Sequence, residues 1–358
     1  MSTTVRTCTT ITEYEAWDDY VSQMSGAHYF QTYGWLKSYE PMGFTPHVIV
    51  YDEEGAVRGG VAFISAKLPL LPWRIFIVPH GPIPSDPDVP SWEPLMKRLD
   101  ETCREQRAIY VQLYPHEFSN QSLLLRRLKD MGYTAPAMFT GHRFSSTPVC
   151  IDLIGKSEED ILMSFRQKTR QYVRKAISGK CVVRTEVNPI MFDKIYDLLL
   201  EHGDLMGYRP RPYASLRAAW EWFAPKRNAL FVQAWRDEVL IGAIFLIFTG
   251  RTAYYLAGAV RRGFAEYRPA ELLHWHAICE AIRRKTNTYD LVNVGTAGVA
   301  QFKAGFRPDV RAWHEPSTKL YRPAIANLMR LADHSCRPLL RRFGRYRANR
   351  LANHHRPM

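Results

Sequence analysis

Residues 254–306 constrain the fold more than any other part of the chain. The pattern is typical of a strand at 254–259, a helix at 267–278 and a second strand at 289–295, followed by Phe302-Lys303-Ala304-Gly305-Phe306. A right-handed crossover through the helix would place the two strands side by side in one sheet. We therefore expect a ligand near the carboxyl ends of these strands, close to Lys303.

Two hairpins of similar pattern indicate a duplicated domain. The strands 47–51 and 57–64 flank an acidic turn, and the strands 230–235 and 239–248 flank another. Val232 and Gly242 of the second hairpin correspond to Val50 and Gly60 of the first, and both pairs are the same distance apart in the sequence. Helices precede each hairpin, and a strand, a helix and a strand follow it. The sequence thus predicts an α/β protein (α+β, with mixed sheets) made of two copies of one domain.

Length and composition agree with a two-domain cytosolic protein. The chain has 358 residues, and its longest apolar run, 239–248, is too short to span a bilayer. The N-terminus lacks the pattern of a signal peptide. The six cysteines are scattered without a CxxC pair, and His274 and His276 point in different directions on their helix, so we expect no metal site.

The charge balance favours polyanionic partners. There are 48 Lys and Arg residues against 35 Asp and Glu, a net charge of +13. Nucleic acid, nucleotide diphosphates and anionic lipid headgroups all attract such a protein. The alternative is a general excess of charge that keeps the protein soluble.

One predicted helix concentrates positive charge. Ser157 and Asp160 form a capping-box pattern at the start of a helix predicted at 157–177. Between residues 161 and 185 there is no acid but there are seven cations: Arg166, Lys168, Arg170, Arg174, Lys175, Lys180 and Arg184. Arg166, Arg170 and Arg174 are four residues apart and should share one helix face, where an anion such as a phosphate chain would offset their repulsion. A solvated face is the alternative.

Lys303 lies between the aromatic residues Phe302 and Phe306. A cation in such surroundings could stabilise negative charge on a carbonyl oxygen. A desolvated lysine could instead lose its proton and act as a base. An ordinary lysine at a strand edge is the third interpretation.

The C-terminal segment 322–358 contains nine arginines and one acid, Asp333, with leucines interspersed. This pattern is typical of a basic amphipathic helix suited to tRNA or a membrane surface. The alternative is a terminal helix that packs on the first domain.

Several segments resemble the Fem family of peptidoglycan aminoacyltransferases. They are Phe30-Gln31-Thr32 with Trp35, His80-Gly81-Pro82, Thr147 with Ile151-Asp152-Leu153, Phe165–Ala176, Tyr254-Tyr255, Pro269 with Leu272-Leu273 and Trp275, Tyr289-Asp290-Leu291, and Phe302-Lys303 with Gly305-Phe306. The resemblance implies two tandem acetyltransferase-like (GNAT) domains, at 1–147 and 148–321, followed by the basic segment 322–358.

The resemblance also implies an activity. An amino acid would pass from aminoacyl-tRNA to the amine of a UDP-linked or lipid-linked muropeptide, without a cofactor, in the cytoplasm at the inner face of the membrane. Lys303, beside Phe302, would stabilise the oxyanion. The helix with Arg166, Arg170 and Arg174 would hold the acceptor diphosphate. Lys37, Tyr114 and Tyr255 are further candidates for substrate binding.

Two other functions remain open. An acyl-CoA N-acyltransferase would bind the CoA diphosphate on a Gln/Arg-x-x-Gly-x-Gly/Ala loop at a helix N-terminus. Aligning Ala270 with the end of that loop places Arg268 at the essential glycine, and Pro269 removes an amide, so we expect this cradle to be broken, although an acyl carrier protein could still be the donor. The third possibility is a non-catalytic protein that binds RNA or a membrane surface.

Overall fold

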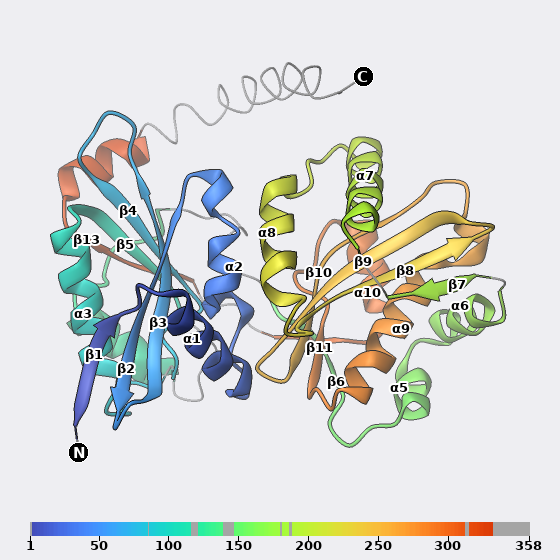
Figure 1. Ribbon diagram of the computed structural model, residues 1–358, viewed down its shortest axis with the longest axis horizontal. Helices are drawn as coiled ribbons and strands as arrows, with labels where there is room; N and C mark the ends of the chain where they lie inside the picture. The colour runs from blue at the N-terminus through green and yellow to red at the C-terminus, as the bar shows by residue number, and fades with distance from the viewer. Residues whose placement is uncertain are drawn as a thin grey trace.

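The computed structural model describes residues 2–84, 86–115, 121–138, 147–179, 181–185, 188–311 and 315–331. Two mixed sheets lie side by side, each covered by helices, in two halves of the molecule (Figure 1). No helix among these residues is long and apolar enough to cross a membrane.

The first sheet has the strand order β1-β2-β3-β4-β5-β13. Its strands are β1 (Thr3–Thr7), β2 (Thr45–Glu53), β3 (Ala56–Lys67), β4 (Arg74–Pro79), β5 (Ala108–Tyr114) and β13 (Ser317–Leu320). Only β4 and β5 run parallel, because α3 (Trp92–Glu105) crosses over between them. The other neighbouring strands are antiparallel.

The second sheet has the order β12-β6-β11-β10-β9-β8-β7. Its strands are β12 (Asp309–Val310), β6 (Val149–Asp152), β11 (Thr288–Asp290), β10 (Thr252–Val260), β9 (Val239–Thr249), β8 (Ala229–Arg236) and β7 (Val182–Arg184). The helix α9 (Pro269–Arg283) joins β10 to β11, and these strands pair in parallel from Thr252 opposite Thr288. The predicted crossover is confirmed.

The predicted repeat holds for the order of elements. In each sheet an antiparallel hairpin leads through a third strand and a crossover helix to a parallel neighbour. The residue pairs differ, however: Val50 lies opposite Gly60, whereas Val232 lies opposite Ile244.

The remaining described helices surround the sheets. They are α1 (Ile11–Gln23), α2 (Tyr33–Lys37), α4 (Gln121–Asp130), α5 (Glu158–Ser164), α6 (Gln167–Ser178), α7 (Pro189–Met206), α8 (Tyr213–Phe223), α10 (Ala297–Ala304) and a helical segment at 323–331, with the 3-10 turns η1 (Tyr29–Gln31), η2 (Glu40–Met42) and η3 (Ala265–Tyr267).

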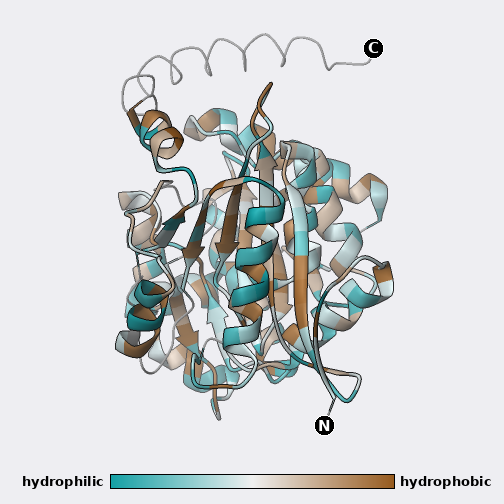
Figure 2. Cartoon of the chain, turned by 90° about the vertical axis from the view of Figure 1, so that its left-hand side faces the viewer, coloured by the Kyte–Doolittle hydropathy of each residue, from teal (hydrophilic) through white to brown (hydrophobic). Residues whose placement is uncertain are grey.

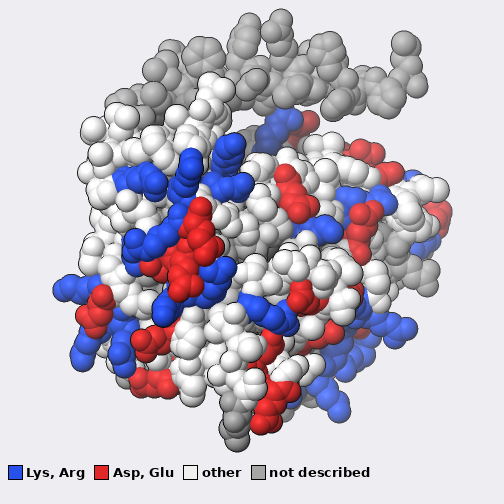
Figure 3. Space-filling view, turned by 60° about the vertical axis from the view of Figure 1, so that its left-hand side comes forward, with Lys and Arg blue, Asp and Glu red and all other residues white. Residues whose placement is uncertain are grey.

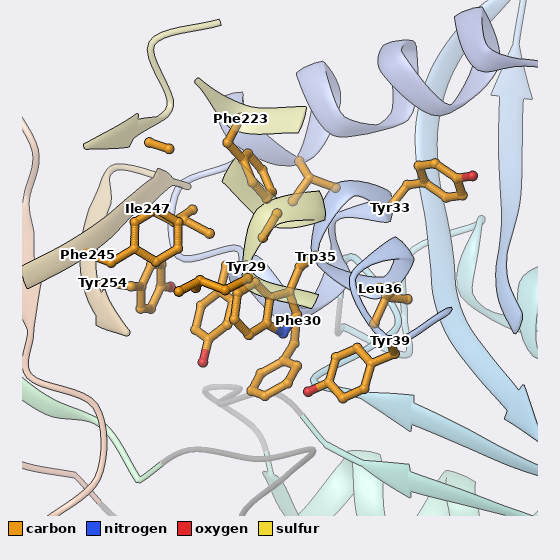
Figure 4. Close-up of a cluster of buried hydrophobic side chains, with 14 of the residues drawn as sticks. Tyr29, Phe30, Tyr33, Trp35, Leu36, Tyr39, Phe223, Phe245, Ile247 and Tyr254 are labelled. Atoms are coloured by element: carbon orange, nitrogen blue, oxygen red, sulfur yellow. The ribbon is translucent and has the colours of Figure 1, made fainter. Parts of the chain in front are cut away.

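One hydrophobic core runs through both halves. The largest buried cluster joins residues of α1, η1 and α2 to residues of α7, α8, β8, β9 and β10. Figure 4 shows the ring of Tyr29 next to that of Tyr254, and their centroids are 4.8 Å apart. The Asp18 carboxylate accepts hydrogen bonds from the Gly34 amide at 3.0 Å and from Trp222 Nε1, across the contact, at 2.8 Å. A shared apolar core of this kind holds the two halves in one arrangement.

The helix predicted at 157–177 is two helices. The chain is extended at Phe165 (φ −66°, ψ 159°), between α5 and α6. The Phe165 ring is fully buried, with its centroid 5.0 Å from that of Phe306 and 6.1 Å from that of Trp275. Burial of this ring against α9 and against Phe306, just after the Phe302-Lys303 segment, accompanies the break, which the capping signal at Ser157 does not reveal.

The chain returns to the first half after the second sheet. The strand β13, which the sequence places in the second domain, pairs with β5, Ser317 lying opposite Leu113. Residues 323–331 are helical, and Ala326 is buried in a small cluster with Ile109 and Tyr110. The described start of the basic segment therefore packs on the first sheet. The remainder, 332–358, lies outside the described residues.

Candidate active site

A pocket opens where β10 and β11 part. The strands pair over only three residues, after which β10 continues to Val260 while β11 ends at Asp290, short of the predicted end at 295. The pocket has a volume of about 270 Å³. Its lining includes Tyr255, Gly258, His274, Phe302 and Lys303, with His202 and Met206 of α7. The pocket thus lies near the carboxyl ends of β10 and β11, where the sequence predicts a ligand.

Lys303 lies on α10 rather than at a strand edge, and only 6% of it is exposed. Its ammonium donates hydrogen bonds to three successive carbonyl oxygens, those of Leu291 at 2.7 Å, Val292 at 2.8 Å and Asn293 at 2.7 Å. Val292 (φ 46°) and Asn293 (φ 61°) are left-handed, an uncommon conformation for a β-branched residue such as valine. The ammonium therefore holds a strained turn together.

Burial lowers the pKa of the Lys303 ammonium to about 8, while the Asp290 carboxylate acts in the opposite direction. The group thus remains mostly protonated at neutral pH. Its three N–H bonds have protein partners, so an incoming oxyanion must displace a carbonyl oxygen to accept a hydrogen bond. The charge also acts on the pocket, since Nζ lies 5.7 Å from the centroid of the Tyr255 ring.

His274 provides an uncharged wall beside Lys303. Its Nδ1 is 2.8 Å from the hydroxyl of Tyr289, and its ring meets that of Tyr255 edge-on at 4.6 Å. Burial, aided by the Lys303 charge, lowers the pKa of His274 to about 3, so the imidazole is neutral. Sequence reasoning missed this residue because it tested His274 only as a metal ligand together with His276. Among the described residues, no three His, Cys, Asp or Glu side chains gather as a metal site would require.

A second pocket, of about 320 Å³, adjoins the first and shares Gly298 and Phe302 with it. Arg166, Lys168, Thr169 and Tyr172 line one side, and Glu271 of α9 lines another. Arg166 immediately precedes α6, whose first turn has no side-chain cap. The pocket therefore combines two exposed cations, the uncapped N-terminus of α6 and one carboxylate.

Glu271 is only 8% exposed and forms no hydrogen bond or ion pair with another residue in the described part of the chain. Burial raises the pKa of its carboxyl, while the nearby Arg268 acts to lower it. Glu271 also lines a third pocket, of about 490 Å³, together with Arg261, Arg262 and Arg268. Sequence patterns missed Glu271, although an acid in the first turn after Pro269 was visible.

Only two of the three arginines predicted to share one helix lie on it, because α6 begins at Gln167 and Arg166 is its N-cap residue. Arg166 lines the second pocket, but Arg170 points elsewhere: its Nη1 donates to the carbonyls of Met163 at 3.0 Å and Phe165 at 2.7 Å, at the end of α5. Arg174 Nη2 lies 3.9 Å from Met163 Sδ. Arg170 and Arg174 thus support the junction between α5 and α6.

Lys37 and Tyr114 lie in the contact between the two halves, not in these pockets. The Lys37 ammonium is 5.4 Å from the centroid of the Trp222 ring, and the buried Tyr114 hydroxyl accepts a hydrogen bond from Gln112 Nε2 at 2.7 Å. Arg211, which the sequence did not single out, stacks there on Trp35 at 4.3 Å. The substrate-binding roles of Lys37 and Tyr114 remain predictions.

The start of α9 is unsuited to a diphosphate. Arg268 is left-handed (φ 53°) and its guanidinium stacks on Tyr172 at 3.7 Å. Pro269 opens the helix without an N–H, and Glu271 places a carboxylate in the first turn. A helix N-terminus attracts anions through free amides and its dipole, and both are compromised here.

Comparison with known proteins establishes the family. The model of the FemAB family matches residues 10–188, half of the chain. The chain belongs to the FemAB family. A second model, described as acetyltransferase (GNAT) domain, matches residues 163–304, which include Lys303.

Relatives of this FemAB chain include lipid II:glycine glycyltransferases. The one from Staphylococcus epidermidis is 19% identical over 337 residues, covering 76% of this chain and 81% of the relative. The one from Staphylococcus aureus is 21% identical over 214 residues, covering 52% and 51%.

Solved structures share the fold of this FemAB chain. FemX superposes with a TM-score of 0.77 at 14% identity, covering 91% of this chain and 100% of FemX. A tandem GNAT protein from the clavulanic acid biosynthesis pathway gives 0.51 at 11% identity, with 89% and 98% covered. The protein therefore has two tandem GNAT-like domains, as the resemblance implied.

Proposed function

We propose that the protein is an aminoacyltransferase that moves an amino acid from aminoacyl-tRNA to the amine of a lipid-linked cell-wall precursor. The observation that carries the proposal is the pair of adjoining pockets, with the Lys303 cation in one and the buried Glu271 carboxylate in the other. Membership of the FemAB family and the glycyltransferase relatives support it.

The reaction is attack of the acceptor amine on the ester carbonyl of the donor. A C–N bond forms and the C–O bond to the ribose breaks, while the proton lost by the amine ends on the ribose hydroxyl. The carbonyl oxygen is negatively charged in the tetrahedral intermediate. Lys303 stabilises that charge, after exchanging one of its carbonyl partners for the oxyanion. No covalent enzyme intermediate is required.

Charge at the head of α9 favours an aminoacyl donor over acyl-CoA. The Glu271 carboxylate repels a diphosphate but attracts the protonated α-amine of an aminoacyl group. Arg166 and Lys168, across the same pocket, hold the phosphate-bearing part of a substrate. They take the place of Arg170 and Arg174, whose side chains support α5.

Glu271→Gln should raise KM for aminoacyl-tRNA by about 10- to 100-fold, as expected for loss of a charge-assisted hydrogen bond, and should change kcat little. The measurement is steady-state kinetics with aminoacyl-tRNA and with N-acetylated aminoacyl-tRNA, which lacks the positive charge. With the acetylated donor the variant should be no worse than the wild type.

Glu266→Gln serves as the matched control, because Glu266 is an exposed acid just before α9. Its KM should equal that of the wild type. If Glu271→Gln raises KM equally for both donors, the carboxylate does not bind the amine.

The donor itself is tested in three parallel reactions. Each contains the protein, a lipid-linked muropeptide and one labelled donor: aminoacyl-tRNA, acyl-CoA or acyl-loaded carrier protein. We expect label to move only from aminoacyl-tRNA. Transfer from acyl-CoA, with none from aminoacyl-tRNA, would refute the proposed function.

A further inference from the structure

The loop between β3 and β4 presents leucine side chains to solvent. Its sequence is Leu68-Pro69-Leu70-Leu71-Pro72-Trp73. Leu70 is completely exposed (104%) and left-handed (φ 63°), and Leu71 is 39% exposed. The loop is nevertheless well defined, since Leu68 N donates to Trp73 O at 2.9 Å and Leu71 N to Leu68 O at 3.3 Å. An exposed apolar tip on an ordered loop marks an interaction site.

A second apolar surface lies at the same end of the first sheet. The helix at 323–331 buries Ala326 but leaves Leu328 (67%) and Leu331 (66%) exposed. Other residues of this helix pack on the same small cluster as Leu68 and Trp73 of the loop. Figure 1 shows the helix beside the β3–β4 loop, and in Figure 2 the loop projects from the molecule with a brown tip.

Cations gather behind the apolar tip. They are Lys67, Arg74, Arg107, Arg322 and Arg330, and none is seen in an ion pair with an acid in the described part of the chain. Two of them also brace the protein itself, since Arg322 Nη1 donates to Ala108 O at 2.7 Å and Arg330 Nη2 to Pro136 O at 3.4 Å. Lys67 lies opposite Arg74 at the base of the loop, and the Arg74 amide donates to Arg107 O at 3.3 Å. Figure 3 shows several Lys and Arg side chains close together on this face of the molecule, below a group of uncharged side chains.

We propose that the β3–β4 loop and the helix 323–331 dock the protein on an anionic lipid bilayer. The leucines enter the boundary between headgroups and acyl chains, the exposed Lys67 and Arg107 meet lipid phosphates, and the other three cations add to the positive charge of the surface. The chain continues from residue 331, on this surface, into a segment with seven arginines and one acid over 332–358, which adds attraction for the same partner. RNA would satisfy the cations equally well but would leave the exposed leucines unexplained.

The test is flotation of the full chain with vesicles of phosphatidylcholine alone or of equal parts phosphatidylcholine and phosphatidylglycerol. The wild type should float with the anionic vesicles and not with the neutral ones. The double variant L70D/L71D should bind the anionic vesicles about 100-fold more weakly, because two apolar groups are lost and two negative charges face the lipid.

The matched control is Ile190→Asp, at the start of α7 in the other half, where the isoleucine is 69% exposed. It should float like the wild type. Unchanged flotation of L70D/L71D, or no binding of wild type to anionic vesicles, would overturn the proposal. If an RNA oligonucleotide competes with vesicles for the protein, and binds L70D/L71D as tightly as the wild type, the surface would be assigned to RNA instead.

The docking proposal stands apart from the transferase assignment. If the proposed function holds, L70D/L71D should transfer the amino acid to a water-soluble muropeptide as fast as the wild type does, and should lose activity only on vesicle-borne acceptor. If the protein binds vesicles but transfers no amino acid, the proposed function is refuted and the docking proposal still holds.

Discussion

Lys303→Met should lower kcat of the folded enzyme by about 10²–10³, the loss expected when one preorganised donor to an oxyanion is removed. Methionine fills a similar volume without the charge. The variant should also lose stability, because the carbonyls of Leu291, Val292 and Asn293 lose their common partner, at a cost of about 1–3 kcal/mol for each group left unpaired. Turnover should therefore be measured at a temperature low enough for the variant to be folded, as checked by circular dichroism. Near wild-type turnover there would exclude the catalytic role.

The pH profile separates the two chemical roles of Lys303. With a pKa of about 8, a cation that stabilises an oxyanion is lost above pH 8, so kcat should fall at higher pH. A lysine acting as a base would give the opposite result, a rise in kcat as pH passes through 8.

The depressed pKa also affects stability. Between pH 8 and 10.5 the unfolded chain keeps the lysine proton that the folded chain has lost, so the free energy of unfolding should rise with pH in this window. Lys303→Met should lack that rise. An identical pH dependence of the unfolding free energy in the two proteins would mean that the pKa of Lys303 is not lowered in the folded protein.

Gly250→Ala should destabilise the protein by about 3–6 kcal/mol. Gly250, in the turn between β9 and β10, is left-handed (φ 58°), and a Cβ there would lie 2.3 Å from the carbonyl oxygen of Ala27. The two segments cannot easily move apart, since Gly26 N donates to Gly250 O at 3.1 Å and Gly250 N to Ser22 O at 3.2 Å. Left-handed strain, overpacking and a lost backbone hydrogen bond together account for this loss of stability. Urea unfolding measures the change.

The control is Gly207→Ala at the end of α7. Gly207 is also left-handed (φ 73°), but nothing lies within 4 Å of the position of its Cβ. It should lose only about 1–2 kcal/mol, the conformational part of the effect. Equal losses in the two variants would show that the contact between the halves does not depend on this close approach.

Much of the fold follows from local patterns in the sequence. Strand, turn and helix signals repeated in both halves predicted the hairpins β2–β3 and β8–β9 and the crossover through α9. The break at Phe165 and the return of β13 to the first sheet were not predicted. Both depend on contacts between residues far apart in the chain, which no local signal encodes.

The candidate site was predictable only in part. Aromatic neighbours identified Lys303, but its three carbonyl partners depend on the left-handed turn at Val292 and Asn293, in a segment that resembled a strand. The spacing of Arg166, Arg170 and Arg174 suggested one binding face, yet two of the three guanidinium groups serve the end of α5. Glu271 looked like an ordinary acid in a first helical turn until its burial was known.

The path of the chain through β13 has a consequence for synthesis on the ribosome. The second sheet begins and ends at neighbouring points, because Arg311 N donates to Pro148 O at 3.1 Å and β12 pairs with β6, so it is an insertion within the first half. A nascent chain released or paused near residue 147 has β5 as an open edge, a template for pairing with other chains. That edge is closed only when residues 317–320 emerge, after the whole inserted sheet has been made.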